Sequence, residues 1–517
     1  MERTLNLSYY FNRFARQAPN KPALVDQDGV TWTRSQFVSR INRVGNALIG
    51  LGLNLGDRVA LLHDDSRQYL EADYGVMAGG LVRVPLDPRL SREQIVSQLK
   101  DAGASAIIVS KKHLEMITAV CQELGHIIVV STDGKSGEAL DYEEILKLAS
   151  PIWSNPIKHD TLASLNYTGG TTGQPKAVML NHSNLCQIIS NALIGRPVVS
   201  SDVFLNVRPL WPIAAINNLF HLFGGALVVL GGKFEAEQLG KLVSKHRATA
   251  TSLVPTQLVR LLDGGIVQAE LATLHTIDIG AGAVQPDVFR SYLELLGPKI
   301  GVLYGLTEAS WTCYLSPKEF TLDKERSERL IRSAGREMLG YRVTIQNEDG
   351  QELPPHSDGE IVIQGSNLMQ GYWNQPDLTN AVLYNGEFHT GDLGHLDEEG
   401  YLYVVGRKKE VIRSGGSSIL PQEVEHVLVK HPAIVEAAVL GVADREWGES
   451  VKAFIVLRPG HSVTYQEISD HCREHLASYM KPKWIEVVES LPRSHYGKVL
   501  KHLLVGDQAS VTGKLLP

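Results

Sequence analysis

Residues 167–176, which read YTGGTTGQPK, have the residue types of a phosphate-binding loop. Three glycines alternate with three threonines, and the run ends on a lysine. Glycine allows positive φ angles and close approach of the backbone to a ligand. Successive N–H groups, hydroxyls and an ammonium group can then donate hydrogen bonds to phosphate oxygens. The spacing is not that of the P-loop G-x-x-x-x-G-K-[ST], and a flexible surface loop is the alternative interpretation.

Four further segments combine glycines with hydroxyl or charged residues. In chain order they are YGLTE at 304–308, TGD at 390–392, GRKKE at 406–410 and PRSHYGK at 492–498. Taken singly, each has an ordinary structural interpretation. A Thr-Glu pair is typical of the start of a helix, and Arg-Lys-Lys or Gly-Lys is typical of an exposed turn.

In this order the five segments resemble the signature motifs of the adenylate-forming superfamily, which contains acyl-CoA synthetases, luciferases and adenylation domains of peptide synthetases. The resemblance runs from residues 20–25 to Lys498 and is closest to the acyl-CoA synthetases. It implies that ATP activates a carboxylic acid to an acyl-AMP with release of pyrophosphate, and that coenzyme A then accepts the acyl group. The expected acid is fatty, aryl or another medium-to-large acid, because the expected pocket segments carry more apolar and aromatic residues than charge.

Joining a carboxylate to AMP brings two anions together at the α-phosphorus. At about 4 Å their repulsion is on the order of 1–4 kcal/mol in partly screened surroundings. The site therefore needs a cation between them, a metal ion and donors for the leaving pyrophosphate. The resemblance assigns Lys498 as the catalytic cation, Glu308 as the Mg²⁺ ligand and Thr307 as a phosphate donor. A carboxylate together with phosphate oxygens is a usual ligand set for Mg²⁺.

The resemblance also assigns positions to ATP and coenzyme A. Asp392 would accept both ribose hydroxyls, and Lys409 would be the hinge at which the small domain swings. The expected cofactor-binding residues are, from the phosphate loop, Thr168, Gly169, Gly170, Thr171, Thr172, Gly173 and Lys176; around the adenine, Gly282, Ala283, Tyr304 and Gly305; at the phosphates, Thr307 and Lys498; at the ribose and hinge, Asp392, Arg407 and Lys409; and along the thiol channel, Gly415 and Gly416.

The chain departs from the family pattern most clearly at residues 209–212, which read PLWP. They align with a Pro-Leu-aromatic-His motif, so Pro212 stands where the family has a histidine that contributes to adenylate formation. A proline side chain can neither donate nor accept a hydrogen bond. This replacement predicts weaker adenylation or an unusually shaped acid. Trp211, Asn217 and Trp311 are candidates for lining the acid pocket.

The elements that position these motifs alternate between strand and helix in the first third of the chain. Apolar residues at helical spacing over 37–48 predict a helix, and 58–62 and 106–109 read as buried strands. Ser91 and Gln94 form a capping box ahead of another helix. Strand, helix, strand at this spacing indicates an α/β fold with parallel pairing. The more polar segment 132–156 reads as a connector.

The later part of the chain changes in pattern. Short alternating strands are expected between 340 and 405, and a small α+β unit follows. The predicted fold class is α/β: a large N-terminal domain, 1–405, of α/β subdomains plus a small β-barrel-like part, and a small mobile α+β C-terminal domain, 406–517. In the family the active site lies between these two domains.

Composition limits the class of protein. With 517 residues the chain is long enough for two or more domains, and its net charge of −7 argues against a nucleic-acid partner. The four cysteines lie far apart, which is typical of a reducing compartment. No signal peptide is evident, and the most apolar run, 219–230, contains a histidine and two glycines and is too short to cross a bilayer. A cytoplasmic location is expected.

Two other functions are consistent with these motifs. One is an acyl-adenylate ligase that loads the phosphopantetheine of a separate carrier protein. The other is a degenerate homologue that binds an acyl-adenylate or nucleotide without making one, for which Pro212 is the supporting observation. The expected oligomeric state is a monomer or a homodimer.

Overall fold

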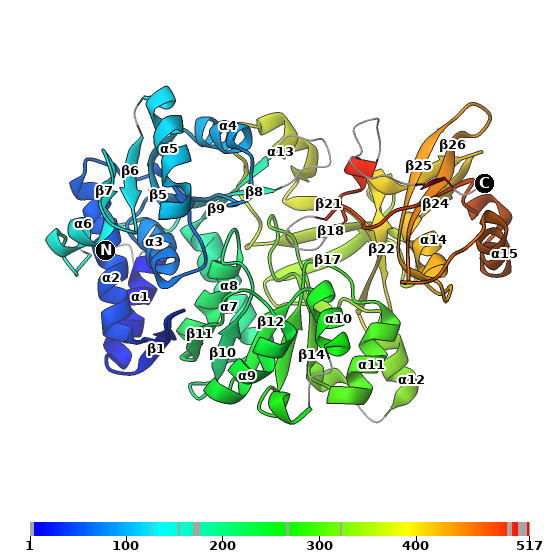
Figure 1. The fold of residues 1–517 in the computed structure, drawn as a ribbon, viewed down its shortest axis with the longest axis horizontal. Helices are drawn as coiled ribbons and strands as arrows, with labels where there is room; N and C mark the ends of the chain where they lie inside the picture. Colours follow the sequence, from blue (N-terminus) through cyan, green and yellow to red (C-terminus); the bar gives the residue numbers. More distant parts are fainter. Residues whose placement is uncertain are drawn as a thin grey trace. The chain divides into compact units, whose positions relative to one another are not determined.

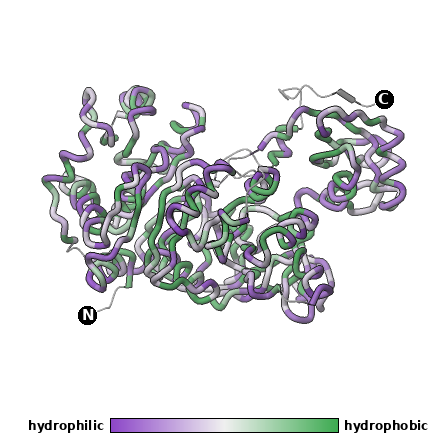
Figure 2. Tube along the Cα trace, turned by 60° about the horizontal axis from the view of Figure 1, so that its bottom comes forward, coloured by the Kyte–Doolittle hydropathy of each residue, from purple (hydrophilic) through white to green (hydrophobic). Residues whose placement is uncertain are grey.

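The structure is a computed structural model that describes residues 5–125, 127–153, 156–168, 176–264, 268–320, 323–493, 499–504 and 514–515 (Figure 1). The chain divides into two compact units. The first comprises Met1–Arg342 and Gln364–Phe388, and the second comprises Val343–Ile363 and His389–Pro517. Hydrophobic residues concentrate in the inner strands of each unit and hydrophilic residues along the outer turns (Figure 2). Among the described residues, no helix is both long and apolar enough to span a membrane.

The first unit contains an eight-stranded sheet with the order β19-β9-β8-β4-β3-β5-β6-β7. The strands from β8 to β7 pair in parallel, whereas β9 and β19 add as antiparallel strands. The buried strands predicted at 58–62 and 106–109 are confirmed as β3 and β5. The bounds are β3 Arg58–Leu62, β4 Val82–Pro85, β5 Ala104–Val109, β6 Ile128–Ser131, β7 Leu140–Asp141, β8 Leu162–Thr168, β9 Lys176–Asn181 and β19 Gly371–Tyr372.

The helices of this part begin and end at the signals that the sequence carries. Ser91 and Gln94 form the expected capping box, and Gly103 ends the helix with φ of 60°. A left-handed residue at this position is best supplied by glycine. The helix predicted over 37–48 is confirmed within α2. The bounds are α1 Leu7–Gln17, α2 Arg34–Gly50, α3 Arg67–Ala78, α4 Arg92–Ala102, α5 Lys111–Leu124, α6 Tyr142–Leu148 and α7 His182–Gly195.

A nine-stranded sheet, also in the first unit, has the order β16-β15-β14-β13-β12-β10-β11-β1-β2. The strands from β14 to β1 are parallel, so their carboxyl ends meet at one edge, where α/β folds bind ligands. The bounds are β1 Pro22–Val25, β2 Thr31–Thr33, β10 Val203–Asn206, β11 Leu227–Leu230, β12 Ala250–Leu253, β13 Thr276–Ile279, β14 Ile300–Tyr304, β15 Cys313–Leu315 and β16 Arg336–Glu337, with helices α8 Ala214–Gly224, α9 Ala236–His246, α10 Pro255–Asp263, α11 Pro286–Leu296, α12 Lys324–Leu330 and α13 Pro376–Val382.

The short strands expected between 340 and 405 form a five-stranded sheet in which β17, β18, β21 and β20 are neighbours and β22 pairs with β21. A six-stranded sheet and two helices follow, and the capping box of Thr464 and Glu467 begins α15 as expected. The bounds are β17 Tyr341–Gln346, β18 Gly359–Gly365, β20 Leu383–Tyr384, β21 Glu387–Leu396, β22 Leu402–Arg407, β23 Ile412–Ser414, β24 Ser417–Ile419, α14 Pro421–Leu428, β25 Ile434–Asp444, β26 Gly448–Leu457, α15 Tyr465–His475, β27 Trp484–Val487 and β28 Lys514–Leu515.

Candidate functional site

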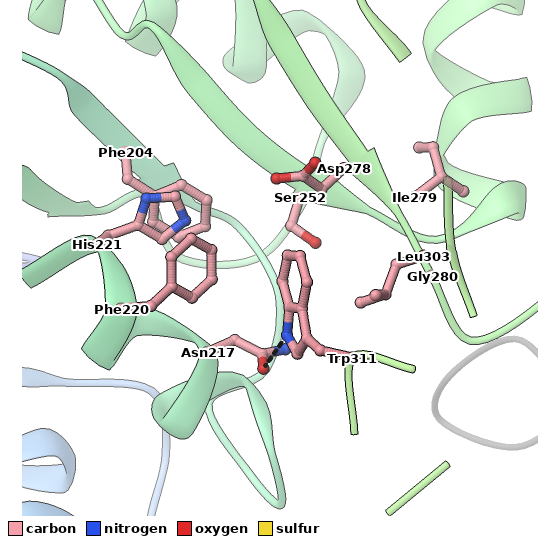
Figure 3. Close-up of a pocket in the computed structure, with 10 residues that line it drawn as sticks. All are labelled: Phe204, Asn217, Phe220, His221, Ser252, Asp278, Ile279, Gly280, Leu303 and Trp311. Atoms are coloured by element: carbon pink, nitrogen blue, oxygen red, sulfur yellow. Dashed lines mark hydrogen bonds between the residues drawn. The ribbon is translucent and has the colours of Figure 1, made fainter. Parts of the chain in front are cut away.

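A cavity lies at the carboxyl edge of the nine-stranded sheet, where β10, β12, β13 and β14 end and helix α8 covers them (Figure 3). It encloses about 280 Å³ of empty space, part of which is open to solvent. Asn217 and Trp311, two of the three expected pocket residues, line it, and Trp211 does not. The lining residues are Phe204, Asn217, Phe220, His221, Ser252, Asp278, Ile279, Gly280, Leu303 and Trp311.

The one carboxylate in the cavity wall, Asp278, is already paired. Its Oδ2 lies 2.8 Å from Nε of Arg196, and its Oδ1 accepts a 2.8 Å hydrogen bond from the hydroxyl of Tyr314. Arg196 and Asp278 are both buried. Because the ion pair balances the carboxylate, the cavity wall carries no net charge from Asp278.

Two other polar side chains in the wall also have partners. The hydroxyl of Ser252 accepts a 3.3 Å hydrogen bond from Nη1 of Arg208, and Oδ1 of Asn217 accepts one of 3.3 Å from the indole N–H of Trp311. The bond from Trp311 fixes the position of its ring against the cavity (Figure 3). Polar groups in the wall are therefore largely satisfied by the protein itself.

Aromatic rings form much of the remaining wall. The imidazole of His221 stacks on Phe204, with ring centroids 3.7 Å apart and an interplanar angle of 15°, and lies 3.9 Å from the ring of Phe220. Trp311 packs edge-on against Phe220 at 5.0 Å. Burial, with a smaller contribution from Arg196, lowers the pKa of His221 well below its ordinary value. The imidazole is therefore neutral at physiological pH.

Lys176, Tyr372 and Glu308 form a second cluster in the first unit. The ammonium of Lys176 lies 4.8 Å from the centroid of the Tyr372 ring, and the Tyr372 hydroxyl donates a 2.8 Å hydrogen bond to Oε1 of Glu308. Burial, followed by the charge of Glu308, raises the pKa of Tyr372, which keeps the hydroxyl protonated as a donor. The sequence identified Lys176 and Glu308 but not Tyr372, which lies on the short strand β19 and has no local chemical signal.

Thr168 and Lys176 are cross-strand partners at the ends of β8 and β9. The two residues bracket the expected phosphate loop, and the pairing of β8 with β9 brings them together. Gly169, Gly170, Thr171, Thr172 and Gly173 lie outside the described residues, as does Lys498. Their roles stay predictions.

The YGLTE motif follows directly from the end of β14. A Cβ atom on Gly305 would lie 2.9 Å from the backbone nitrogen of Trp311, so only glycine fits where the chain turns back on itself. Reciprocal backbone hydrogen bonds between Leu306 and Ala309 close this turn. Thr307 and Glu308 therefore lie in a tight turn and not at the start of a helix. Gly282 and Ala283 follow β13 at the same edge of the sheet and are exposed.

The expected ribose-binding residues lie together in the second unit. Asp392 and Arg407 are cross-strand partners on β21 and β22, with Nε of Arg407 2.9 Å from Oδ1 of Asp392. Lys409 lies in the short helical turn immediately after β22. The structure places Asp392 beside Arg407, whereas contact of either residue with ribose stays a prediction.

Gly415 and Gly416 form the turn between β23 and β24, with φ of 56° and 83°. Gly415 donates a 2.8 Å hydrogen bond to the carbonyl of Trp447, and a Cβ atom on it would lie 2.4 Å from the indole ring. Both positions therefore require glycine for backbone reasons. Their place along a thiol channel stays a prediction.

The segment 209–212, where the family histidine is replaced, is held by its backbone. The backbone N–H of Leu210 donates a 2.7 Å hydrogen bond to Oδ1 of Asp65, and the carbonyl of Pro212 accepts one of 2.6 Å from Nη2 of Arg83. The guanidinium of Arg89 lies 5.1 Å from the ring centroid of Trp211. Burial raises the pKa of Asp65 to about 6.

Comparisons with known proteins agree with these motifs. The AMP-binding enzyme family matches residues 11–373, and its C-terminal domain family matches residues 423–498. A feruloyl-CoA synthase of Amycolatopsis sp is 34% identical over 95% of this chain and 96% of its own length. An indoleacetate–CoA ligase of Aromatoleum aromaticum is 32% identical over 96% of this chain and 97% of its own length.

Solved structures share the fold. The o-succinylbenzoate CoA synthetase of Bacillus subtilis, in complex with its acyl-adenylate intermediate, superposes with a TM-score of 0.84. It is 29% identical, and the match covers 96% of this chain and 98% of that one. The shared architecture includes a large N-terminal and a small C-terminal domain.

We expect replacement of Asp65 by Asn to stabilise the protein at neutral pH. The folded pKa of about 6 lies above the ordinary value of 3.8, so ionisation between these values favours unfolding and wild-type stability falls as the pH rises through them. Asn keeps an oxygen acceptor for Leu210 without this ionisation. The variant should gain about 1–2 kcal/mol at pH 7.5, with no gain below pH ~4. Thermal unfolding at both pH values measures the difference.

The matched control is Asp28→Asn, which removes an exposed carboxylate. It should change stability by less than about 0.5 kcal/mol at either pH. A loss of stability in Asp65→Asn at pH 7.5 would contradict the raised pKa.

Proposed function

The chain belongs to the AMP-binding enzyme family and is an AMP-forming acyl-CoA synthetase, and we propose that its acid substrate carries an aromatic ring. ATP and coenzyme A are its cosubstrates. The aromatic wall of the cavity is the observation that carries this proposal. Phe204, Phe220 and Trp311 present ring faces and edges to the cavity, and aromatic rings pack favourably against one another.

The names of two relatives also support an acid with an aromatic ring. Two of the relatives, named for feruloyl-CoA and indoleacetate–CoA, act by name on acids with aromatic rings. An aromatic acid therefore agrees both with the rings of the cavity wall and with the names of these relatives.

Adenylation requires neutralisation of the negative charge on the acid and the phosphates. We assign this role to Lys498 and to a Mg²⁺ ion that Glu308 would bind. Lys498 would place its ammonium between the acid carboxylate and the α-phosphate, and Thr307 would donate to a phosphate oxygen. Glu308 fits a Mg²⁺ site because the residue is only 9% exposed and its carboxylate is oriented by Tyr372. Mg²⁺ commonly takes one or two protein carboxylates with phosphate oxygens, and when bound it would neutralise polyphosphate charge.

The domains and the remaining residues follow the family pattern in this proposal. Residues 1–405 would form the AMP-binding domain and 406–517 a small domain that swings at Lys409. Asp392 and Arg407 would bind the ribose, and their side-by-side position on β21 and β22 supports a joint role. In the second orientation Gly415 and Gly416 would line the path of the thiol.

We also propose a cytoplasmic location. All four cysteines are unpaired in the structure, and three of them are buried. Thiols persist in a reducing compartment, whereas secreted proteins more often form disulfides.

Replacement of Lys498 by Ala should abolish most of the adenylation half-reaction. Loss of one preorganised donor or charge at a developing anion costs about 10²–10³ in rate. Acid-dependent exchange between ATP and labelled pyrophosphate measures this step without coenzyme A. Lys430→Ala, at an exposed lysine of the second unit, is the matched control and should exchange at the wild-type rate.

The same experiment tests the degenerate-homologue hypothesis. Wild-type exchange that depends on both an acid and Lys498 excludes a passive binder. Exchange that persists in Lys498→Ala would contradict the assigned cation.

Replacement of Tyr372 by Phe should weaken the response to Mg²⁺. The change removes the hydroxyl that orients Glu308 but keeps the ring beneath Lys176. Outer partners of metal ligands typically contribute about 10–100-fold to metal affinity or activity. We expect the Mg²⁺ concentration for half-maximal exchange to rise about tenfold, with recovery at saturating Mg²⁺.

Tyr341→Phe is the control for this variant. Its hydroxyl donates a 2.7 Å hydrogen bond to the carbonyl of Ser310 and does not contact Glu308. An equal shift in both variants would indicate a general loss of packing and would exclude a positioning role for Tyr372.

A further inference from the structure

The imidazole of His221 has no hydrogen bond to any residue in the described part of the chain, although the side chain is only 1% exposed. Its Nδ1 is buried without a partner. Buried polar groups are almost always hydrogen bonded, so a solitary imidazole calls for an explanation. His221 also lines the cavity.

The packing around His221 holds its ring in place. Phe204 stacks on one face, and the Phe220 ring contacts the imidazole at 3.9 Å. Figure 3 shows an edge of the imidazole turned toward the space bounded by Ser252 and Trp311. A partner in this space would meet a ring whose orientation is already fixed by its aromatic neighbours.

The other polar groups of the wall determine what the partner must be. Asp278, Ser252 and the oxygen of Asn217 are already occupied by Arg196, Arg208 and Trp311, respectively. No lysine or arginine is among the described residues that line the cavity, so a second carboxylate on the ligand would have no ion-pair partner in this wall. A neutral imidazole, in contrast, offers one donor and one acceptor nitrogen. A hydroxyl group also donates and accepts, so it matches either tautomer.

We infer that His221 is a specificity-determining residue that hydrogen bonds a hydroxyl group on the ring of an aromatic acid. This inference rests on the proposed function, because it concerns the acid of the same reaction. Burial keeps the imidazole neutral, which suits an uncharged hydroxyl better than an ionised group. The buried ring would lose this partner when the hydroxyl is absent, so the site should discriminate against the unsubstituted acid.

The test compares matched acids with the full-length enzyme. Phenylpropenoic acids that carry a ring hydroxyl, a hydrogen or a methyl group at the same position are assayed by acid-dependent ATP–pyrophosphate exchange and by thioester formation with coenzyme A. We expect kcat/KM for the best hydroxy acid to exceed that for its unsubstituted partner about tenfold or more. His221→Phe, which keeps an aromatic ring in the stack, should reduce this ratio to about one.

Leu303→Val, at another residue that lines the cavity, is the control for cavity shape. It alters the neighbouring wall without removing a polar group, so it should change kcat/KM for hydroxylated and unsubstituted acids by similar factors and keep their ratio. His221→Asn, which retains a donor and an acceptor, should keep part of the preference. Thermal unfolding of each variant establishes that it is folded.

The outcomes separate this inference from the proposed function. Exchange with aromatic acids but no preference for a hydroxyl at any ring position overturns the role of His221 and leaves the synthetase intact. A preference that survives in His221→Phe overturns it as well. Absence of exchange with every aromatic acid, when aliphatic acids are turned over, overturns the proposed acid class and this inference together.

Discussion

The hydrogen bond between Tyr372 and Glu308 connects the two large sheets of the first unit. It lies next to two of the segments that carry the predicted ATP-binding motifs. Tyr372 belongs to β19, which pairs with β9, the strand that begins at Lys176. Glu308 lies in the turn after β14 of the other sheet, and its carbonyl also accepts a 2.9 Å hydrogen bond from the backbone of Met369. Because the bond is buried, breaking it would leave a carboxylate desolvated without its donor. The strand that begins at Lys176 and the YGLTE turn are therefore held in one arrangement.

The cavity at the carboxyl edge of the nine-stranded sheet differs in its electrostatics from the cluster of Lys176, Tyr372 and Glu308. Its carboxylate is neutralised by an ion pair with Arg196 and accepts a hydrogen bond from the hydroxyl of Tyr314. A buried ion pair contributes little net stability, but removal of one partner leaves a costly unpaired charge. Asp278 and Arg196 are thus committed to each other, and the wall presents rings and a neutral imidazole to the ligand. In the proposed function, the side chains assigned to ATP and the side chains assigned to the ring of the acid are therefore separate sets.

Local signals predicted most of the elements, because capping boxes and apolar periodicity act over a few residues. The capping pair of Ser91 and Gln94 is an example. Contacts between distant segments were not predictable in this way. The polar segment 132–156, interpreted as a connector, contains helix α6, whose buried Tyr142 hydrogen bonds Glu71 at 3.3 Å. Tyr372 likewise hydrogen bonds Glu308, which is 64 positions away in the chain. Trp211 does not line the cavity, and this too depends on how distant segments pack against one another.

The replacement of the family histidine by Pro212 changes chemistry more than position. The segment is held through the N–H of Leu210 and the carbonyl of Pro212, and a backbone carbonyl is available from any residue. Arg83, fully buried, also donates to Asn166 at 2.7 Å, so the same guanidinium ties the segment to β8. The course of the chain is therefore compatible with proline, while the imidazole itself is lost. Under the proposed function, transition-state stabilisation at the acid carboxylate would then come from Lys498 and the other charged groups assigned to this step.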